Sequence, residues 1–186
     1  MKRLREICDK HGILLIFDEV ITGFGRMGVG FGADFYGVVP DMLNFAKCVT
    51  NGVFPMGGVI CREHIYQAFQ DANAKSPDHA IELFHGYTYS GHPVACAAAI
   101  ATLNVFKEQN LFARAGEMGK VLGDAMHSQL KGLPNVIGIR TIGLAGAVEL
   151  SSVAGLPGKR AYDIFLDCYH QGVLVRHAGD NLVLCP

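Results

Sequence analysis

Residues 13–17, Ile-Leu-Leu-Ile-Phe, form an unbroken apolar run that ends at two carboxylates, Asp18 and Glu19. The run is too short to cross a membrane, and its composition is typical of a buried strand. Before it, residues 2–11 place apolar side chains at helical spacing, and Gly12 is a plausible helix stop. A helix, a tight turn and a fully apolar strand together predict an α/β unit whose parallel sheet is covered on both faces.

The rest of the chain alternates between strand and helix patterns, with a glycine-rich loop at 23–32 and a polar, turn-rich stretch at 71–92. Strong helix formers run from Pro93 to residue 132, which predicts one long helix, or two with a break near Asn110. The other predicted elements are strands at 42–46, 57–62 and 136–150, helices at 62–70 and 159–172, and a last hairpin at 173–186.

These patterns indicate two parts of different architecture. We expect residues 1–104 to belong to a larger α/β domain and residues 105–186 to a smaller α+β domain, with the change inside the long helix. Half of the 186 residues are hydrophobic and 18% are charged, so the chain can bury a sizeable core. The sequence starts in mid-helix and stops directly after a strand, and we therefore expect it to be a piece of a larger protein.

Charge and residue spacing argue against several kinds of partner. The formal net charge is −1 and no Lys/Arg run is present, which gives no case for binding nucleic acid or a membrane surface. There is neither a signal-peptide pattern nor a membrane-length apolar run, so a cytoplasmic protein is expected. The six cysteines are widely spaced and the eight histidines scattered, so neither disulfides nor a metal site is expected.

Two residues at predicted strand ends carry possible chemistry. Asp18 occupies the carboxyl end of a strand, where ligands bind in open parallel sheets. A carboxylate there needs a positive or hydrogen-bonding partner, which could be a ligand, a neighbouring helix or Arg26. Lys47 directly follows the strand at 42–46, a position that suits an amine for Schiff-base chemistry, although its amine could also extend to water.

Three blocks of sequence carry a family resemblance, in this order: FDEVITGFGRMG at 17–28, VVPDMLNFAKCVTNG at 38–52 and HGYTYSGHPVACAA at 85–98. They resemble the class III pyridoxal-phosphate-dependent aminotransferases of fold type I, and the resemblance continues to the end of the chain. It implies an α/β fold: part of the large, mostly parallel sheet domain, followed by a small C-terminal α+β domain. Within the class, the sequence is most similar to the β-alanine (ω-amino acid):pyruvate aminotransferases.

The resemblance implies roles for five residues in binding pyridoxal phosphate and substrate. Asp18 would bond the pyridine nitrogen and keep it protonated, and Val20 would press on one face of the ring if the strand continues that far. Lys47 would carry the cofactor as a Schiff base and transfer a proton. Thr88 would donate to the cofactor phosphate, in this family across to the neighbouring subunit's site. Arg176 would receive the substrate carboxylate.

Plainer roles stay open for the weaker members of this set. Thr88 could be an ordinary turn residue and Arg176 a surface arginine. Glu19 and Arg26 are predicted to form a structural pair or to anchor a loop. The glycines of the loop at 23–32 lack the strand and helix context of a dinucleotide site. Cys48 stands where many class III members have glycine, which loosens the subfamily assignment but not the role of the lysine.

The implied function is transfer of an amino group from an ω-amino acid or amine, such as β-alanine, to a keto acid such as pyruvate, in a homodimer or a dimer of dimers. The alternatives are another class III activity, acting on ornithine, 4-aminobutyrate or a diamino acid, an aminomutase, or a non-catalytic fragment. The family's Gly-Ser phosphate turn and ring-covering aromatic residue have no counterpart here. The 186-residue chain alone is therefore expected to bind the cofactor weakly and to be inactive.

Overall fold

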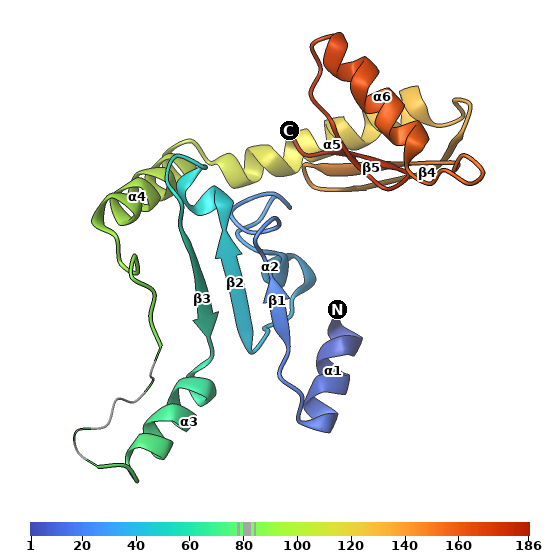
Figure 1. Ribbon diagram of the computed structural model, residues 1–186. Helices are drawn as coiled ribbons and strands as arrows, with labels where there is room; N and C mark the ends of the chain where they lie inside the picture. The colour runs from blue at the N-terminus through green and yellow to red at the C-terminus, as the bar shows by residue number, and fades with distance from the viewer. Residues whose placement is uncertain (78, 80–82, 84) are drawn as a thin grey trace. The chain divides into compact units, whose positions relative to one another are not determined.

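The computed structural model describes residues 1–77, 79, 83 and 85–186, and it divides into two compact units (Figure 1). The first unit contains residues 1–24 and 30–110, and the second contains residues 25–29 and 111–186. Each unit has its own sheet, with strand order β1-β2-β3 in the first and β4-β5-β7-β6 in the second. The expected domain boundary between residues 104 and 105 stays a prediction; the compact units part after residue 110.

The first unit opens with helix α1 (Lys2–His11), which ends at Gly12 in the left-handed conformation, as the sequence predicts. Strand β1 covers only Ile16–Asp18 and is shorter than the apolar run. The reason is visible at Leu15, whose backbone N–H donates to the side chain of Asp41 at 2.7 Å instead of joining a ladder.

Strands β2 (Met42–Ala46) and β3 (Gly57–Cys61) complete the first sheet, close to the predicted bounds. β1 and β2 are parallel, with Ile16 opposite Met42 and Asp18 opposite Asn44. β3 is antiparallel to β2, because the connection from β2 to β3 is too short for the crossover that a parallel neighbour requires. The prediction of a parallel sheet is therefore correct for one of the two strand pairs.

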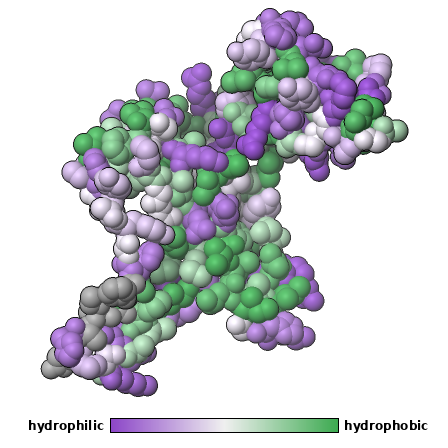
Figure 2. All heavy atoms as spheres, viewed as in Figure 1, coloured by the Kyte–Doolittle hydropathy of each residue, from purple (hydrophilic) through white to green (hydrophobic). Residues whose placement is uncertain are grey.

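One face of this sheet is packed by helices. Cys8 of α1 and Phe17 of β1 belong to a buried cluster against which Ala33 packs, and Ala33 lies in the short helix α2 (Gly32–Tyr36), which the sequence did not predict. On the opposite face Ile16 is 51% exposed and Val59 is 63% exposed. Among the described residues, helices thus cover only one face of this sheet, and Figure 2 shows apolar side chains at the surface of the first unit.

The next predicted helices are present as α3 (Glu63–Asn73), α4 (Pro93–Glu108) and α5 (Leu111–Leu130). A short 3-10 helix, η1 (Lys47–Thr50), follows β2 and was not predicted. Pro93 opens α4. Of the two alternatives, one long helix or two with a break, the second is correct, and the break lies at Asn110, which has a left-handed φ of 49°. Part of the turn-rich stretch at 71–92 lies outside the described residues. None of the described helices is both long and apolar enough to cross a membrane.

The second unit is an antiparallel sheet with two helices. Its strands are β4 (Val136–Ile142), β5 (Ala145–Leu150), β6 (Arg176–Ala178) and β7 (Asn181–Leu184), and α6 (Lys159–His170) joins α5 as its second helix. Met126 of α5, Val148 and Leu150 of β5 and Ala161 of α6 form the buried core. The predicted paired strands and the last hairpin are both present.

Candidate active site

Asp18 and Lys47 lie at the same edge of the first sheet. Asp18 ends β1 opposite Asn44, and Lys47 directly follows the last residue of β2. Because β1 and β2 are parallel, their carboxyl ends meet at one edge, which is where ligands bind in open α/β sheets. Both side chains are exposed. The structure therefore brings the predicted acid and the predicted amine together at an accessible edge.

Lys47 has an unusual backbone conformation, with a left-handed φ of 51° in a residue that has a Cβ. Such a conformation costs roughly 1–3 kcal/mol and persists only where the surroundings enforce it. Here the following residues Val49 and Thr50 are buried, and the Thr50 hydroxyl donates to the Phe54 carbonyl at 2.5 Å. The turn is also closed by Gly52, whose N–H donates to the Lys47 carbonyl at 3.3 Å. The fold thus holds Lys47 in a strained conformation at the sheet edge.

Asp18 has one carboxylate oxygen available for a ligand. The Val20 N–H donates to Asp18 Oδ1 at 3.0 Å, and Oδ2 has no hydrogen-bond partner among the described residues. β1 ends at Asp18 and the chain turns at Val20. The strand alternation that would put Val20 on the same face as Asp18 therefore does not extend to it, and its contact with a ring stays a prediction.

Glu19, next to Asp18, anchors the loop that follows. Its carboxylate is buried and accepts hydrogen bonds from the N–H groups of Gly32 and Ala33 at the start of α2. Of the structural roles that the sequence left open, helix capping thus belongs to Glu19 and not to Asp18. Of the two roles predicted for Glu19 and Arg26, loop anchoring is correct, since the Arg26 guanidinium donates to backbone carbonyls of its own unit, Leu144 at 3.0 Å and Pro186 at 2.5 Å.

Thr88 lies in an exposed turn that precedes α4 in the first unit. Within this turn the Ser90 N–H donates to the Tyr87 carbonyl at 3.0 Å. At its end the His92 ring packs on Phe54, with ring centroids 4.8 Å apart. The Phe54 carbonyl also accepts a hydrogen bond from the Thr50 hydroxyl. Phe54 therefore links the turn that carries Thr88 to η1, the 3-10 helix that begins at Lys47.

Arg176 belongs to the second unit, where it opens β6 opposite Val183 and is exposed. The next residue, His177, packs its ring against Tyr162 and Phe165 of α6, at centroid distances of 5.4 Å and 5.3 Å. Since successive strand residues point to opposite faces, this packing leaves Arg176 on the face of the sheet away from α6. Arg176 is therefore exposed to solvent, on a strand that is held in place by the packing of the neighbouring His177.

Asp41 is a buried acid to which the sequence analysis gave no role. It is 4% exposed, and its Oδ2 accepts hydrogen bonds from the Arg5 guanidinium at 2.6 Å and the Leu15 N–H at 2.7 Å. Burial by itself would raise the pKa of Asp41, but these two hydrogen bonds and the charges of Arg5 and His64 together lower it. The sequence signal was an acid between a proline and an apolar strand. Its role is structural, because it joins α1 and β1 to the start of β2.

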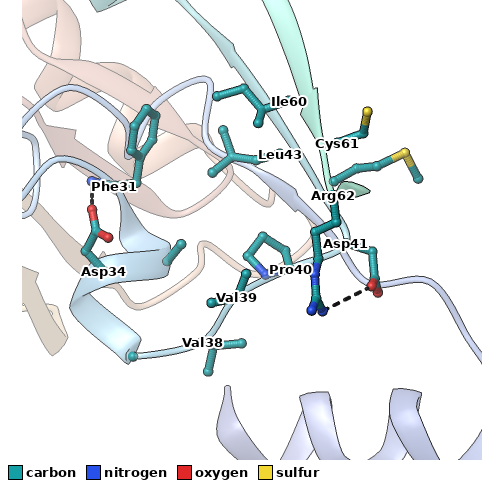
Figure 3. Close-up of a pocket in the computed structure, with 13 residues that line it drawn as sticks. Phe31, Asp34, Val38, Val39, Pro40, Asp41, Leu43, Ile60, Cys61 and Arg62 are labelled. Carbon is teal, nitrogen blue, oxygen red and sulfur yellow. Dashed lines mark hydrogen bonds and ion pairs between the residues drawn. The ribbon is translucent and has the colours of Figure 1, made fainter. Parts of the chain in front are cut away.

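A largely apolar hollow of about 480 Å³ lies at the other end of β2 (Figure 3). It is lined by residues that include Phe31, Val38, Pro40, Ile60 and Arg62, and the Arg62 guanidinium faces Asp41 at 3.7 Å. Since none of the five predicted site residues lines it, the candidate site is the carboxyl edge of β1 and β2 and not this hollow.

The chain belongs to the class III aminotransferases, because the family model Aminotransferase class-III matches residues 1–185. It is 48% identical to the β-alanine–pyruvate aminotransferase of Pseudomonas aeruginosa and 49% identical to an omega-aminotransferase of Caulobacter vibrioides. Both matches cover 100% of this chain and 41% of the relative. The chain thus spans about two fifths of the length of the curated relatives it matches.

The structural comparison confirms the expected fold. The omega transaminase of Pseudomonas jessenii, solved in complex with PMP, matches with a TM-score of 0.90 and 31% identity over 100% of this chain and 41% of that one. The α/β fold of the pyridoxal-phosphate-dependent transferases, fold type I, is therefore correct. Class III aminotransferases use pyridoxal phosphate, so the cofactor prediction is confirmed for the family.

Proposed function

We propose that the protein containing this chain is a transaminase that binds pyridoxal phosphate at the carboxyl edge of β1 and β2. The observation that carries the proposal is that two groups lie at that edge. One is the Asp18 carboxylate, whose Oδ2 is available to a ligand, and the other is the exposed amine of Lys47. The two groups fit the cofactor's chemistry, since a carboxylate stabilises a protonated pyridine nitrogen and an amine bonds to an aldehyde.

When bound, pyridoxal phosphate supplies an electron-accepting ring that stabilises negative charge at the substrate carbon. Asp18 accepts a hydrogen bond at the ring nitrogen, and its charge favours the protonated form of that atom. The Lys47 amine holds the cofactor and, when free, accepts a proton at Nζ and returns it. Thr88 contributes a hydroxyl that donates to the cofactor phosphate. In a homodimer this is the phosphate bound in the partner subunit's site. Arg176 offers a planar pair of donors to a substrate carboxylate.

The proposed reaction transfers an amino group from an ω-amino acid or an amine to a keto acid. Relatives at 48–49% identity named β-alanine–pyruvate aminotransferase and omega-aminotransferase support this choice of donor and acceptor. A putrescine–pyruvate aminotransferase and a probable gamma-aminobutyrate transaminase match at a lower identity of 33%. These relatives support a second candidate, another class III activity with a diamine or 4-aminobutyrate as donor.

The test uses the protein expressed from its complete reading frame and loaded with pyridoxal phosphate. We expect the absorbance band of the bound cofactor to shift on addition of β-alanine and to return on addition of pyruvate. The same measurement with putrescine and with 4-aminobutyrate ranks the donors, and a faster response to either would favour the second candidate. A cofactor spectrum that responds to none of the amino donors would contradict the proposal.

A further inference from the structure

Glu19 is a carboxylate that the proposed reaction does not use, although it lies directly between Asp18 and Val20. It is only 2% exposed. Its Oε1 accepts a hydrogen bond from the Ala33 N–H at 2.7 Å, and its Oε2 accepts one from the Gly32 N–H at 2.8 Å and one from the Thr22 hydroxyl. Both oxygens of a buried charge are thus occupied, so the side chain has a single favourable orientation.

The backbone of Glu19 is fixed as firmly as its side chain. Its N–H donates to the carbonyl of Asn44 in β2 at 2.9 Å, and its own carbonyl accepts from the Gly23 N–H at 2.9 Å. One residue therefore connects the end of β1 to β2, to the turn that follows and to the start of α2. Any rotation of the chain at this point would remove a buried carboxylate from its donors.

The orientation of Glu19 determines that of its neighbour. Successive residues at the end of a strand point to opposite faces of the sheet. With the Glu19 carboxylate directed at α2, Asp18 must point to the other face, on the same side as its ladder partner Asn44. That face is the one that the described helices leave exposed, as Ile16 shows.

We propose that Glu19 is a positioning residue: its buried carboxylate fixes the direction in which Asp18 presents its available oxygen. This inference rests on the proposed function. The competing explanation is that Glu19 only caps α2. The chain offers a control for this explanation, because Asp34 also caps α2, through a hydrogen bond of 3.0 Å from the Phe31 N–H to its Oδ2, but its side chain makes no hydrogen bond to β1 among the described residues.

The experiment compares Glu19→Gln with Asp34→Asn in the protein expressed from its complete reading frame and loaded with pyridoxal phosphate. In Glu19→Gln an NH₂ group replaces one of the two acceptor oxygens, so that a donor would face the N–H group of Gly32 or Ala33. The side chain must therefore reorient. We expect Glu19→Gln to lower kcat roughly 10–100-fold, as a small misplacement of a reacting group does, with little change in KM. We also expect weaker visible circular dichroism of the bound cofactor, which reports how rigidly the ring is held. Asp34→Asn should leave kcat, KM and this signal unchanged.

A double substitution separates positioning from general damage. If Glu19 acts through Asp18, Asp18→Asn combined with Glu19→Gln should be no slower than Asp18→Asn alone, whereas independent effects would multiply. Should Glu19→Gln fail to fold, Thr22→Val removes one donor to the carboxylate and should weaken the circular dichroism signal in the same direction. Multiplying effects, or equal behaviour of Glu19→Gln and Asp34→Asn, would overturn the inference while the proposed function stands. A wild-type cofactor spectrum that does not respond to amino donors would instead overturn the proposed function.

Discussion

Asp18 lies directly opposite Asn44 in the parallel ladder of β1 and β2, and Lys47 follows Asn44 by three residues. The register of two short strands thus sets the placement of an acid and an amine that are far apart in the sequence. Asp18 and Asn44 share one face of the sheet, and the buried carboxylate of Glu19 occupies the other. Changes at the sheet edge and changes that disturb the register should therefore have different effects.

Lys47→Ala should abolish covalent attachment of the cofactor, because in the proposed function its amine is the group that bonds to the aldehyde. Borohydride reduction of the loaded protein followed by peptide mass mapping measures the attachment. Lys107→Ala, in the last turn of α4, is the matched control and should retain it. An adduct on the Lys107 peptide, or one that persists in Lys47→Ala, would remove Lys47 from the mechanism.

Asp18→Asn keeps the size of the side chain but removes the charge that favours a protonated ring nitrogen. We expect kcat with β-alanine to fall roughly 10²–10⁴-fold, the range for losing a positioned charge or proton-transfer partner. Steady-state kinetics measure the change. Glu6→Gln on α1 removes an exposed carboxylate that pairs with Arg3 and should have no effect. Turnover of Asp18→Asn close to that of the wild type would make Asp18 a structural acid only.

Local patterns in the sequence predicted much of the fold. Helix α1 with its stop at Gly12, strand β2 and the break at Asn110 all follow from periodicity and turn chemistry. Helix α2 was missed because it starts in a glycine-rich stretch and its first N–H groups are satisfied by Glu19, a bond between residues distant in sequence. Strand β3 was predicted, but its antiparallel direction was not, because the apolar pattern of a strand does not encode direction.

The residues of the candidate site likewise divide into those that a local sequence pattern could identify and those that it could not. Asp18 and Lys47 could be identified from the rule that polar residues at carboxyl ends of strands face ligands. Thr88 and Arg176 lie in a turn and on an exposed strand, where nothing in the local pattern separates them from ordinary surface residues, so their roles came from family resemblance alone. The structural role of Asp41 depends on Arg5, which precedes it by 36 positions, and no local signal reports such a partner.

Asp41 should make stability depend on pH in the acid range. Its pKa is lower in the folded protein than its ordinary value of 3.8. The stabilisation is therefore complete above the unfolded value and is lost as pH falls through the lower, folded value. We expect the difference in urea midpoint between wild type and Asp41→Asn to be constant near neutral pH and to shrink below about pH 4.

The cost of removing the Asp41 side chain can be bounded. Asp41→Ala leaves the buried N–H of Leu15 without its acceptor and should destabilise the protein by about 1–3 kcal/mol at neutral pH. Asp163→Ala, which breaks an exposed pair with Lys159, is the control and should cost less than about 1 kcal/mol. Equal urea midpoints for the two variants would show that Asp41 does not join α1 to the sheet.

Arg176→Ala should raise KM for pyruvate roughly 10–100-fold, the value of a charge-assisted pair of hydrogen bonds, if Arg176 receives the carboxylate. The half-reaction with a simple amine such as isopropylamine, which has no carboxylate, should change little. Arg140→Ala is the control, because Arg140 is also an exposed strand arginine of the same sheet and donates to Asn181 at 3.0 Å. Equal losses with both substrates would assign Arg176 a structural role.

Two glycines on α5 should respond oppositely to the same substitution. A Cβ at Gly119 would lie 2.5 Å from the carbonyl carbon of Gly143 in the β4–β5 turn, whereas a Cβ at Gly116 would meet Gly28 at an ordinary contact distance of 3.5 Å. Gly119→Ala must therefore push α5 away from the turn, and overpacking of this kind typically costs roughly 1–3 kcal/mol. Gly116→Ala should be neutral or stabilising by up to about 1 kcal/mol, because alanine is the better helix former. Urea unfolding of the two variants measures both effects, and a loss of stability in Gly116→Ala as large as that in Gly119→Ala would contradict the close backbone contact as the cause.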